Sequence, residues 1–200
     1  MTSSEFANIA AIILAAGRST RMGAENKLTA DLSGKPMVRC AAQAALGSRA
    51  RPVVAVVGHE AEAVRAALAG LDVGIVHNPD FATGLASSLR AGIRAVPADC
   101  GGALVLLGDM PQITAEHLDR LIAAFVADAI IVPTQAGKRG NPVLWPAVYF
   151  AEMRQLVGDA GARSLMAAHT DQVRDVDLGT DAIFADVDTP DALARLRRDG

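Results

Sequence analysis

The chain has 200 residues, of which 51% are hydrophobic and 20% are charged, and its formal net charge is −3. Since domains usually hold roughly 100–200 residues, residues 1–200 are expected to form a single domain, and the apolar fraction excludes a disordered chain. The negative charge argues against a nucleic-acid partner. The longest apolar run, residues 6–17, is shorter than the roughly 18 residues of a membrane-spanning helix.

The N-terminus and the cysteines predict the compartment. Glu5 stands where a secretory signal peptide would carry positive charge. Cys40 and Cys100 lack the spacing of a metal site, and they fit small buried thiols in a reducing compartment better than a disulfide. We therefore expect a cytoplasmic protein.

Short β-branched or leucine-rich runs alternate with alanine-rich amphipathic stretches, a pattern typical of βαβ units. The predicted strands are residues 9–14, 52–57, 73–76, 103–107, 130–133, 142–145 and 183–187. The predicted helices are residues 36–46, 61–69, 87–96, 115–126, 161–168 and 190–198. This order indicates an α/β fold, a three-layer α/β/α sandwich with a mainly parallel, mixed sheet. The small alanines on several helices predict a close approach to the sheet.

Two connections are longer than plain turns. Residues 15–35 contain no predicted strand, and connections of this length in a compact domain are usually functional. The polar stretch 134–141 is expected to be either a hairpin turn or a lid. The first connection is therefore the main site candidate.

The long connection is basic and starts at the end of the first strand, where open α/β sheets bind ligands. Residues 18–39 hold five basic and two acidic side chains, a net charge of +3 in a negative chain. Five residues separate Gly17 from Gly23, so the segment is not a P-loop. Glycine backbone and the charges of Arg18, Arg21 and Lys27 suit a triphosphate. The alternative is a solvated loop whose charges serve solubility.

Residues 14–28 read Leu-Ala-Ala-Gly-Arg-Ser-Thr-Arg-Met-Gly-Ala-Glu-Asn-Lys-Leu, and this segment resembles the signature of the nucleotidyltransferases that mature the molybdenum cofactor, especially the cytidylyltransferases. Further similar blocks follow in order at residues 78–89, 108–111, 139–144, 158–163 and 186–190. The resemblance implies a Rossmann-like nucleotidyltransferase fold of the nucleotide-diphospho-sugar transferase type. It also implies that Leu14, Ala15, Ala16, Gly17 and Arg18 border the nucleotide.

Two aspartates are candidate ligands of Mg²⁺, which binds one or two carboxylates and phosphate oxygens. Asp109 follows an apolar strand, and the resemblance makes it the metal residue; it could instead initiate a turn before Pro111. Asp188 resembles a second metal carboxylate, although Thr189 and Pro190 already explain a helix start there. We predict Asp109 and Asp188 as metal ligands and Arg21, Lys27 and Asp109 as catalytic residues.

The block after the third predicted strand carries amide and hydroxyl groups that could read a base and a ribose. The resemblance places Asn78, Gly84 and Ser88 in the nucleotide pocket, whereas ordinary turn and capping chemistry explains the same residues equally well. Asn141 stands where the family more often has histidine, and this departure bears on the acceptor rather than on the nucleotide.

The resemblance implies a Mg²⁺-dependent cytidylyltransferase, in which the phosphate of molybdopterin attacks the α-phosphorus of CTP and pyrophosphate leaves. The methyl group of Ala16 could crowd out a purine, but one methyl group discriminates only weakly, by about 1–3 kcal/mol. The alternatives are guanylyl or other nucleotidyl transfer to a different phosphorylated acceptor, such as a sugar phosphate, and a non-catalytic protein that delivers cofactor to a client molybdoenzyme.

Overall fold

The computed structural model describes residues 7–18, 26–32, 34–159, 161–187 and 189–199. The predicted residues Arg21 and Asp188 therefore lie outside the described part of the chain. No helix within these ranges is long and apolar enough to cross a bilayer.

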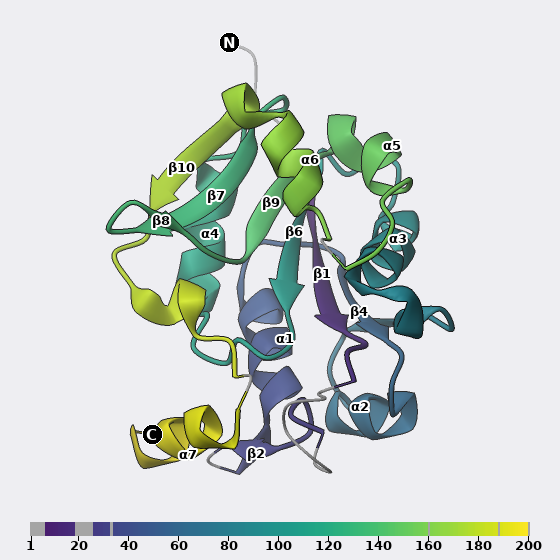
Figure 1. Cartoon of the computed structure of the whole chain (residues 1–200), viewed down its shortest axis with the longest axis vertical. Helices are drawn as coiled ribbons and strands as arrows, with labels where there is room; N and C mark the ends of the chain where they lie inside the picture. The colour runs from purple at the N-terminus through teal and green to yellow at the C-terminus, as the bar shows by residue number, and fades with distance from the viewer. Residues whose placement is uncertain (1–6, 19–25, 33, 160, 188, 200) are drawn as a thin grey trace.

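A mixed, mostly parallel sheet forms the centre of the molecule (Figure 1). Its strands run in the order β10 (Val173–Asp177), β7 (Ile130–Gln135), β9 (Val143–Pro146), β6 (Gly102–Leu107), β1 (Ile9–Ala15), β4 (Val53–Val57) and β5 (Gly74–His77), and β8 (Lys138–Arg139) pairs with β7. β9 is antiparallel to both of its neighbours, and β8 is antiparallel to β7. The other neighbouring pairs are parallel, as predicted for the α/β class.

Helices cover both faces of the sheet (Figure 1). The core on one face includes α1 (Met37–Gly47), α2 (Ala61–Ala67) and α4 (Ala115–Ala123), and the core on the other includes α3 (Leu85–Ala95), α5 (Phe150–Met153) and α6 (Arg163–Ala168). β1 shows why both faces need cover, since Ile9, Ala11 and Ile13 enter the first core and Ala10 and Ile12 enter the second. The three-layer α/β/α prediction is confirmed.

The helices approach the sheet closely because their contact faces carry small residues. A Cβ atom added to Gly92 of α3 would lie 2.5 Å from the Cγ2 atom of Ile12 and 3.2 Å from that of Val56. On the opposite face, Ala41, Ala42 and Ala45 of α1 belong to the core that contains β1. The expectation from the alanine-rich helices is therefore confirmed.

The prediction of a strand over residues 183–187 is wrong. The 3₁₀ helix η5 (Asp181–Phe184) occupies its start, and Thr180 Oγ1 accepts a hydrogen bond from the backbone N–H of Ala182 at 3.2 Å. Ile183 is buried against the core through this turn rather than through strand pairing. The last strand is instead β10. It was not predicted because its sequence is charged and lacks the apolar run by which the other strands were predicted.

Several short elements complete the chain. β2 (Asp31–Leu32) and β3 (Lys35–Pro36) form a small hairpin after the first long connection. The C-terminal helix α7 (Pro190–Asp199) lies beside β2, where Arg197 Nε donates to the carbonyl of Asp31 at 2.9 Å (Figure 1). The polar stretch 134–141 contains the β7–β8 hairpin, whose turn residues Ala136 and Gly137 have φ angles of 49° and 76°. Of the two predicted forms, the hairpin is therefore confirmed.

The two cysteines are free in the structure. Cys100 is buried, Cys40 is half-buried, and burial raises the pKa of both thiols above the usual value. Both side chains therefore stay protonated near neutral pH and pack as small apolar groups.

Candidate active site

The carboxyl ends of β1 and β6 meet at one edge of the sheet. Because the two strands are parallel and adjacent, the loops that follow them leave the sheet side by side. The backbone N–H of Gly108 donates to the carbonyl of Leu14 at 3.0 Å. A Cβ atom at Gly108 would lie 3.1 Å from that carbonyl oxygen, so glycine allows the close approach of the two loops.

A cavity of about 570 Å³ opens at this edge, within the range of about 300–1,000 Å³ typical of small-molecule sites. Eight of the predicted site residues line it: Leu14, Ala16, Gly17, Arg18, Lys27, Gly84, Ser88 and Asp109. Six lining residues were not singled out from the sequence: Leu28, Phe81, Ala82, Leu85, Leu107 and Asp159; Asp186 completes the lining. The predicted loops thus come together around one cavity.

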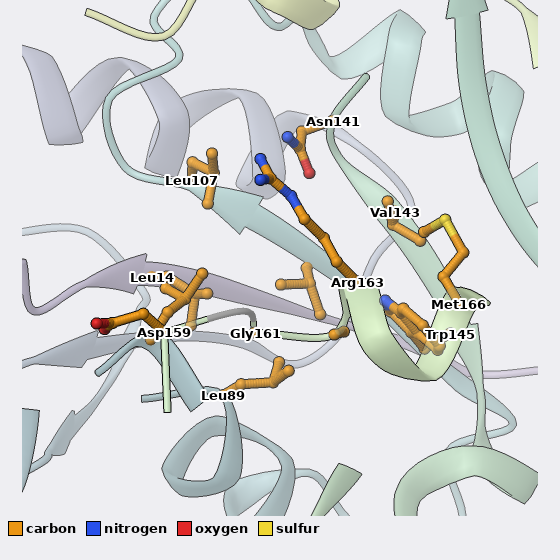
Figure 2. Close-up of a pocket in the computed structure, with 13 residues that line it drawn as sticks. Leu14, Leu89, Leu107, Asn141, Val143, Trp145, Asp159, Gly161, Arg163 and Met166 are labelled. Atoms are coloured by element: carbon orange, nitrogen blue, oxygen red, sulfur yellow. The ribbon is translucent and has the colours of Figure 1, made fainter. Parts of the chain in front are cut away.

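A second, smaller pocket of about 210 Å³ shares Leu14, Leu85, Leu107 and Asp159 with the large cavity. Its remaining lining residues are Leu89, Val105, Asn141, Val143, Trp145, Gly161, Ala162, Arg163 and Met166. Figure 2 shows Arg163 extending from its helix toward Asn141 and Leu107, with Trp145 and Met166 on the opposite side. The two spaces therefore adjoin at the sheet edge.

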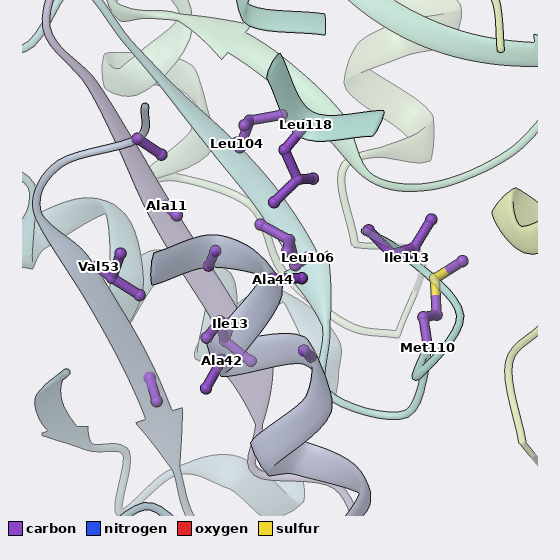
Figure 3. Packing of buried hydrophobic residues seen from close by; sticks show 14 of the residues in the cluster. Ala11, Ile13, Ala42, Ala44, Val53, Leu104, Leu106, Met110, Ile113 and Leu118 are labelled. Atoms are coloured by element: carbon purple, nitrogen blue, oxygen red, sulfur yellow. The ribbon is translucent and has the colours of Figure 1, made fainter. Parts of the chain in front are cut away.

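Asp109 follows the carboxyl end of β6, and its backbone is held there by two contacts. The next residue, Met110, is buried in the core and lies beside Ile113 (Figure 3). The backbone carbonyl of Asp109 accepts a hydrogen bond from the N–H of Val187 at 3.1 Å. The backbone that carries the Asp109 side chain is therefore held in place.

The carboxylate of Asp109 has two unlike oxygens. Oδ2 lies 2.5 Å from Nζ of Lys27, and both side chains are mostly buried. Oδ1 is buried and has no hydrogen-bond partner among the described residues. An unpaired buried carboxylate oxygen is costly unless a cation or another ligand completes it. This oxygen is the strongest sign of a ligand in the structure.

The acidic residues of the cavity fit a divalent cation. Asp186 lines the same cavity as Asp109, and Mg²⁺ typically takes one or two carboxylates together with phosphate oxygens and water. Within the described ranges no three His, Cys, Asp or Glu side chains converge, so phosphate oxygens would supply part of the coordination. Asp186 stands two residues before the predicted ligand Asp188, in the block of residues 186–190 that resembles the family.

Lys27 sits in a tight turn before β2. The backbone N–H of Leu28 donates to Oδ1 of Asn26 at 3.0 Å, and the carbonyl of Leu28 accepts from Val38 at the start of α1 at 2.9 Å. These contacts connect the basic loop to a core helix. The ammonium group is therefore held at the carboxylate rather than extended into solvent.

An aromatic side chain forms one wall of the cavity. A Cβ atom at Gly58 would lie 2.6 Å from Cβ of Phe81 and 2.9 Å from Cβ of Ala16, so glycine lets Phe81 pack beside Ala16. The guanidinium of Arg18 lies 5.6 Å from the centre of the Phe81 ring, a cation–π distance. The ring of His59 is tilted relative to that of Phe81, with centroids 6.0 Å apart.

Gly84 and Ser88 border the cavity at the start of α3. Gly84 has φ +111°, and an added Cβ atom would lie 2.5 Å from Oδ1 of Asp159 and 2.6 Å from the carbonyl of Gly158. The N–H of Ala86 donates to that same carbonyl at 3.1 Å. The loop at residues 158–159 therefore packs directly against the start of the helix.

Asn78 supports this helix rather than the cavity. Its Nδ2 atom donates to Oγ of Ser87 at 2.8 Å and to Oγ of Ser88 at 3.0 Å, and its Oδ1 atom accepts from the N–H of Asp80. Asn78 lines a separate hollow with Arg90 and Arg94. Ala15, also predicted, is buried in β1 and does not line the cavity.

The sequence of residues 11–173 matches the sequence model of a protein family, described as the MobA-like NTP transferase domain. The chain belongs to the MobA-like NTP transferase family. The resemblance found in the sequence is thereby confirmed at the level of the family. A nucleotidyl transferase from Methanothermobacter thermautotroptrophicus, 24% identical, has the same fold, with a TM-score of 0.84 over 96% of this chain and 97% of that one, and the predicted fold class is confirmed as well.

Several known proteins are similar to this chain over nearly its whole length. Rv0371c from Mycobacterium tuberculosis H37Rv is 30% identical, with a TM-score of 0.84, over 99% of this chain and 100% of that one. A crystal structure of Rv0371C in complex with manganese is 29% identical, with a TM-score of 0.81, over 96% of this chain and 100% of that one. The bifunctional protein GlmU of Kineococcus radiotolerans is 33% identical over 204 residues, all of this chain. The chain spans only 40% of that relative's length.

Proposed function

We propose that the protein is a Mg²⁺-dependent nucleotidyltransferase that moves CMP from CTP to the phosphate of molybdopterin and releases pyrophosphate. The observation that carries the proposal is Asp109, whose buried Oδ1 atom lacks a partner in the described chain while Lys27 lies on Oδ2. A carboxylate and an ammonium group in one cavity match the needs of a metal–triphosphate substrate. The manganese complex of a 29% identical relative supports a divalent metal.

The basic side chains would hold the triphosphate. Lys27 can bind a phosphate oxygen from its position beside Asp109, and the exposed guanidinium of Arg18 lies at the rim next to Phe81. Arg21, outside the described residues, remains a predicted third contact. These charges favour the transition state because negative charge moves toward the leaving pyrophosphate during transfer.

A divalent cation held by Asp109, with Asp186 or Asp188, would neutralise the triphosphate and orient it for attack. The acceptor's phosphate oxygen forms the new bond to the α-phosphorus as the bond to the pyrophosphate oxygen breaks. A phosphate monoester is already mostly ionised near pH 7, so no side chain needs to act as a nucleophile. The chain's own contribution is therefore positioning and charge neutralisation.

The base would lie between Ala16 and the start of α3. Ser88 Oγ accepts a hydrogen bond from Asn78, which leaves its own hydrogen available to donate into the cavity. Cytosine offers ring and carbonyl acceptors for such a donor. The methyl group of Ala16 beside Phe81 narrows the space for a larger purine, which supports CTP over GTP.

The test is pyrophosphate release from each of CTP, GTP, ATP and UTP, with Mg²⁺ and molybdopterin as acceptor. We expect release to be fastest with CTP and absent without acceptor. Lys27→Met should slow release strongly, whereas Lys35→Met, at an exposed lysine of β3, should leave it unchanged. Fastest release with GTP would overturn the base assignment. Absence of release with every nucleotide would favour the non-catalytic delivery protein.

A sugar-phosphate acceptor is the second candidate. It is favoured by the match of the whole chain to a protein named GlmU. N-acetylglucosamine 1-phosphate and glucose 1-phosphate, offered in the same assay, test it directly. Faster pyrophosphate release with either sugar phosphate than with molybdopterin would establish this candidate and contradict the proposed acceptor.

A further inference from the structure

A third small core lies apart from the two cores that cover the sheet. It consists of Ala30, Met37, Val187 and Leu193, each no more than 3% exposed, and it joins the β2–β3 hairpin and the start of α1 to the C-terminal helix α7. Figure 1 shows β2 and α7 at the end of the molecule toward which the arrows of β1 and β6 point. The third core therefore lies at the same end as the large cavity, although no described side chain of α7 lines that cavity.

The third core holds the turn that carries Lys27. The backbone N–H of Ala30 donates to the carbonyl of Lys27 at 3.3 Å, and the carbonyl of Ala30 accepts from the N–H of Met37 at 3.1 Å. The side chains of Ala30 and Met37 both belong to the third core. The position of the basic turn therefore depends on how this core packs.

The acidic side of the site is attached to the same core. Val187 directly follows Asp186, which lines the large cavity, and the Val187 side chain is fully buried in the third core. The backbone N–H of Val187 donates to the carbonyl of Asp109 at 3.1 Å. One valine thus connects the two segments that carry the carboxylates of the cavity, Asp109 and Asp186.

The helix α7 completes the core around Val187. Thr189 precedes the helix: its Oγ1 atom accepts from the N–H of Ala192 at 3.2 Å, and its carbonyl accepts from the N–H of Leu193 at 3.1 Å. The Leu193 side chain is buried in the third core, and Arg197 Nε donates to the carbonyl of Asp31 in β2 at 2.9 Å. The helix is therefore attached to the rest of the fold through Leu193 near its start and Arg197 near its end.

We propose that α7 positions the metal-binding carboxylates: Leu193 holds Val187, and Val187 keeps the segments of Asp109 and Asp186 in place for a divalent cation. This inference rests on the proposed function, since it names the residues that support the proposed metal site. Contacts behind metal ligands orient those ligands, and their loss typically weakens metal binding about 10–100-fold. Leu193 and Val187 are therefore positioning residues.

A helix that only covers apolar side chains would affect stability and nothing else. Leu193→Ala opens a cavity in the third core, so the Mg²⁺ concentration that half-maximally promotes CTP binding should rise about tenfold. Binding at saturating Mg²⁺ should return to that of the wild type, because the residues around the nucleotide are unchanged. Leu193→Met conserves the volume and should keep the wild-type Mg²⁺ requirement. Calorimetric titration of CTP at a series of Mg²⁺ concentrations measures the requirement, and urea unfolding measures stability.

Leu68→Ala is the matched control. Leu68 is the same side chain, also 3% exposed, at the end of α2 in a core of the sheet, and it lines neither cavity. This variant should be less stable in urea and should leave the Mg²⁺ requirement unchanged. Arg197→Gln removes the hydrogen bond to Asp31 at an exposed side chain and should raise the requirement about two- to threefold. It decides the question if Leu193→Ala does not fold.

An unchanged Mg²⁺ requirement in Leu193→Ala, or in Arg197→Gln where Leu193→Ala does not fold, would overturn the proposal. An equal rise in Leu68→Ala would also overturn it, because a general loosening of the fold would then explain the effect. CTP binding to the wild type that does not respond to Mg²⁺ would refute the proposed metal–nucleotide site itself. A wild-type response that Leu193→Ala leaves unaltered would refute the role of α7 alone.

Discussion

The ends of β5 and β6 carry two buried polar residues, Asn78 and Asp109, that look alike in sequence and differ in the structure. The amide of Asn78 donates to two serine hydroxyls and accepts from a backbone N–H. The carboxylate of Asp109 has one oxygen on Lys27 and one buried oxygen without a partner among the described residues. A buried polar group that is satisfied internally stabilises the fold, and one that is left incomplete indicates a ligand.

The largest expected effect is on Asp109. Asp109→Asn keeps the shape of the side chain and removes its charge, so the rate of transfer should fall roughly 10²–10³-fold. Asp72→Asn, at an exposed aspartate far from the cavity, is the matched control and should keep full activity. Steady-state pyrophosphate release measures both variants. A rate for Asp109→Asn close to that of the wild type would show that the charge of Asp109 is not needed for transfer.

Gly84→Ala should cause the largest loss of stability. Its φ of +111° is nearly restricted to glycine, and the new Cβ atom would clash with Asp159 and Gly158; overpacking alone costs about 1–3 kcal/mol. Gly70→Ala is the control, because Gly70 also has a positive φ, +78°, but no atom within 4 Å of an added Cβ. Urea unfolding should show the greater loss for Gly84→Ala. Equal losses would mean that the packing of loop 158–159 on α3 contributes nothing.

Asn78→Ala tests the other side of the comparison. It leaves two serine hydroxyls and a backbone N–H without their partner, so the free energy of unfolding should fall by about 1–3 kcal/mol. The thermal shift caused by CTP with Mg²⁺ should remain, since Asn78 does not line the cavity. Loss of that shift with unchanged stability would instead make Asn78 a direct nucleotide contact.

The fold was predictable where a strand is buried on both faces. β1 is apolar throughout because both of its faces are covered, and such a continuous apolar run predicts a buried strand. β10, Val-Arg-Asp-Val-Asp, was missed because it is a largely exposed edge strand with three charged residues. The strand predicted over residues 183–187 was wrong because apolar residues such as Ile183 can also be buried by a 3₁₀ turn.

The site was predictable where function resides in local sequence, and less so where it depends on the path of distant loops. The glycine-rich and basic loop after β1 and the aspartate after β6 could be identified from their positions at strand ends. The place of Phe81 in the site could not be predicted. Phe81 packs beside Ala16 because Gly58, between them, has no side chain, and the sequence does not show that these three residues meet. Arg163 lies in a recognised block, but its place beside Asn141 depends on the packing of α6 (Figure 2).

The smallest expected effect concerns α4, away from the site. The backbone N–H of Thr114 donates to Nδ1 of His117 in a capping box, and burial lowers the pKa of His117 below its usual value. The folded state therefore favours neutral His117, and this contribution to stability, present above about pH 6.5, is lost as the pH falls toward the lowered pKa. His117→Gln keeps a capping acceptor and should flatten the pH dependence of urea unfolding between pH 7 and 5. An unchanged slope would contradict this contribution.

The most direct test of the metal–nucleotide site is calorimetric titration of CTP into wild-type protein, Asp109→Asn and Asn78→Ala, each with and without Mg²⁺. We predict that Mg²⁺ strengthens CTP binding at least about tenfold in the wild type and in Asn78→Ala, and that Asp109→Asn loses this dependence. CTP binding that is equally tight with and without Mg²⁺ in the wild type, or a full response to Mg²⁺ in Asp109→Asn, would contradict the account.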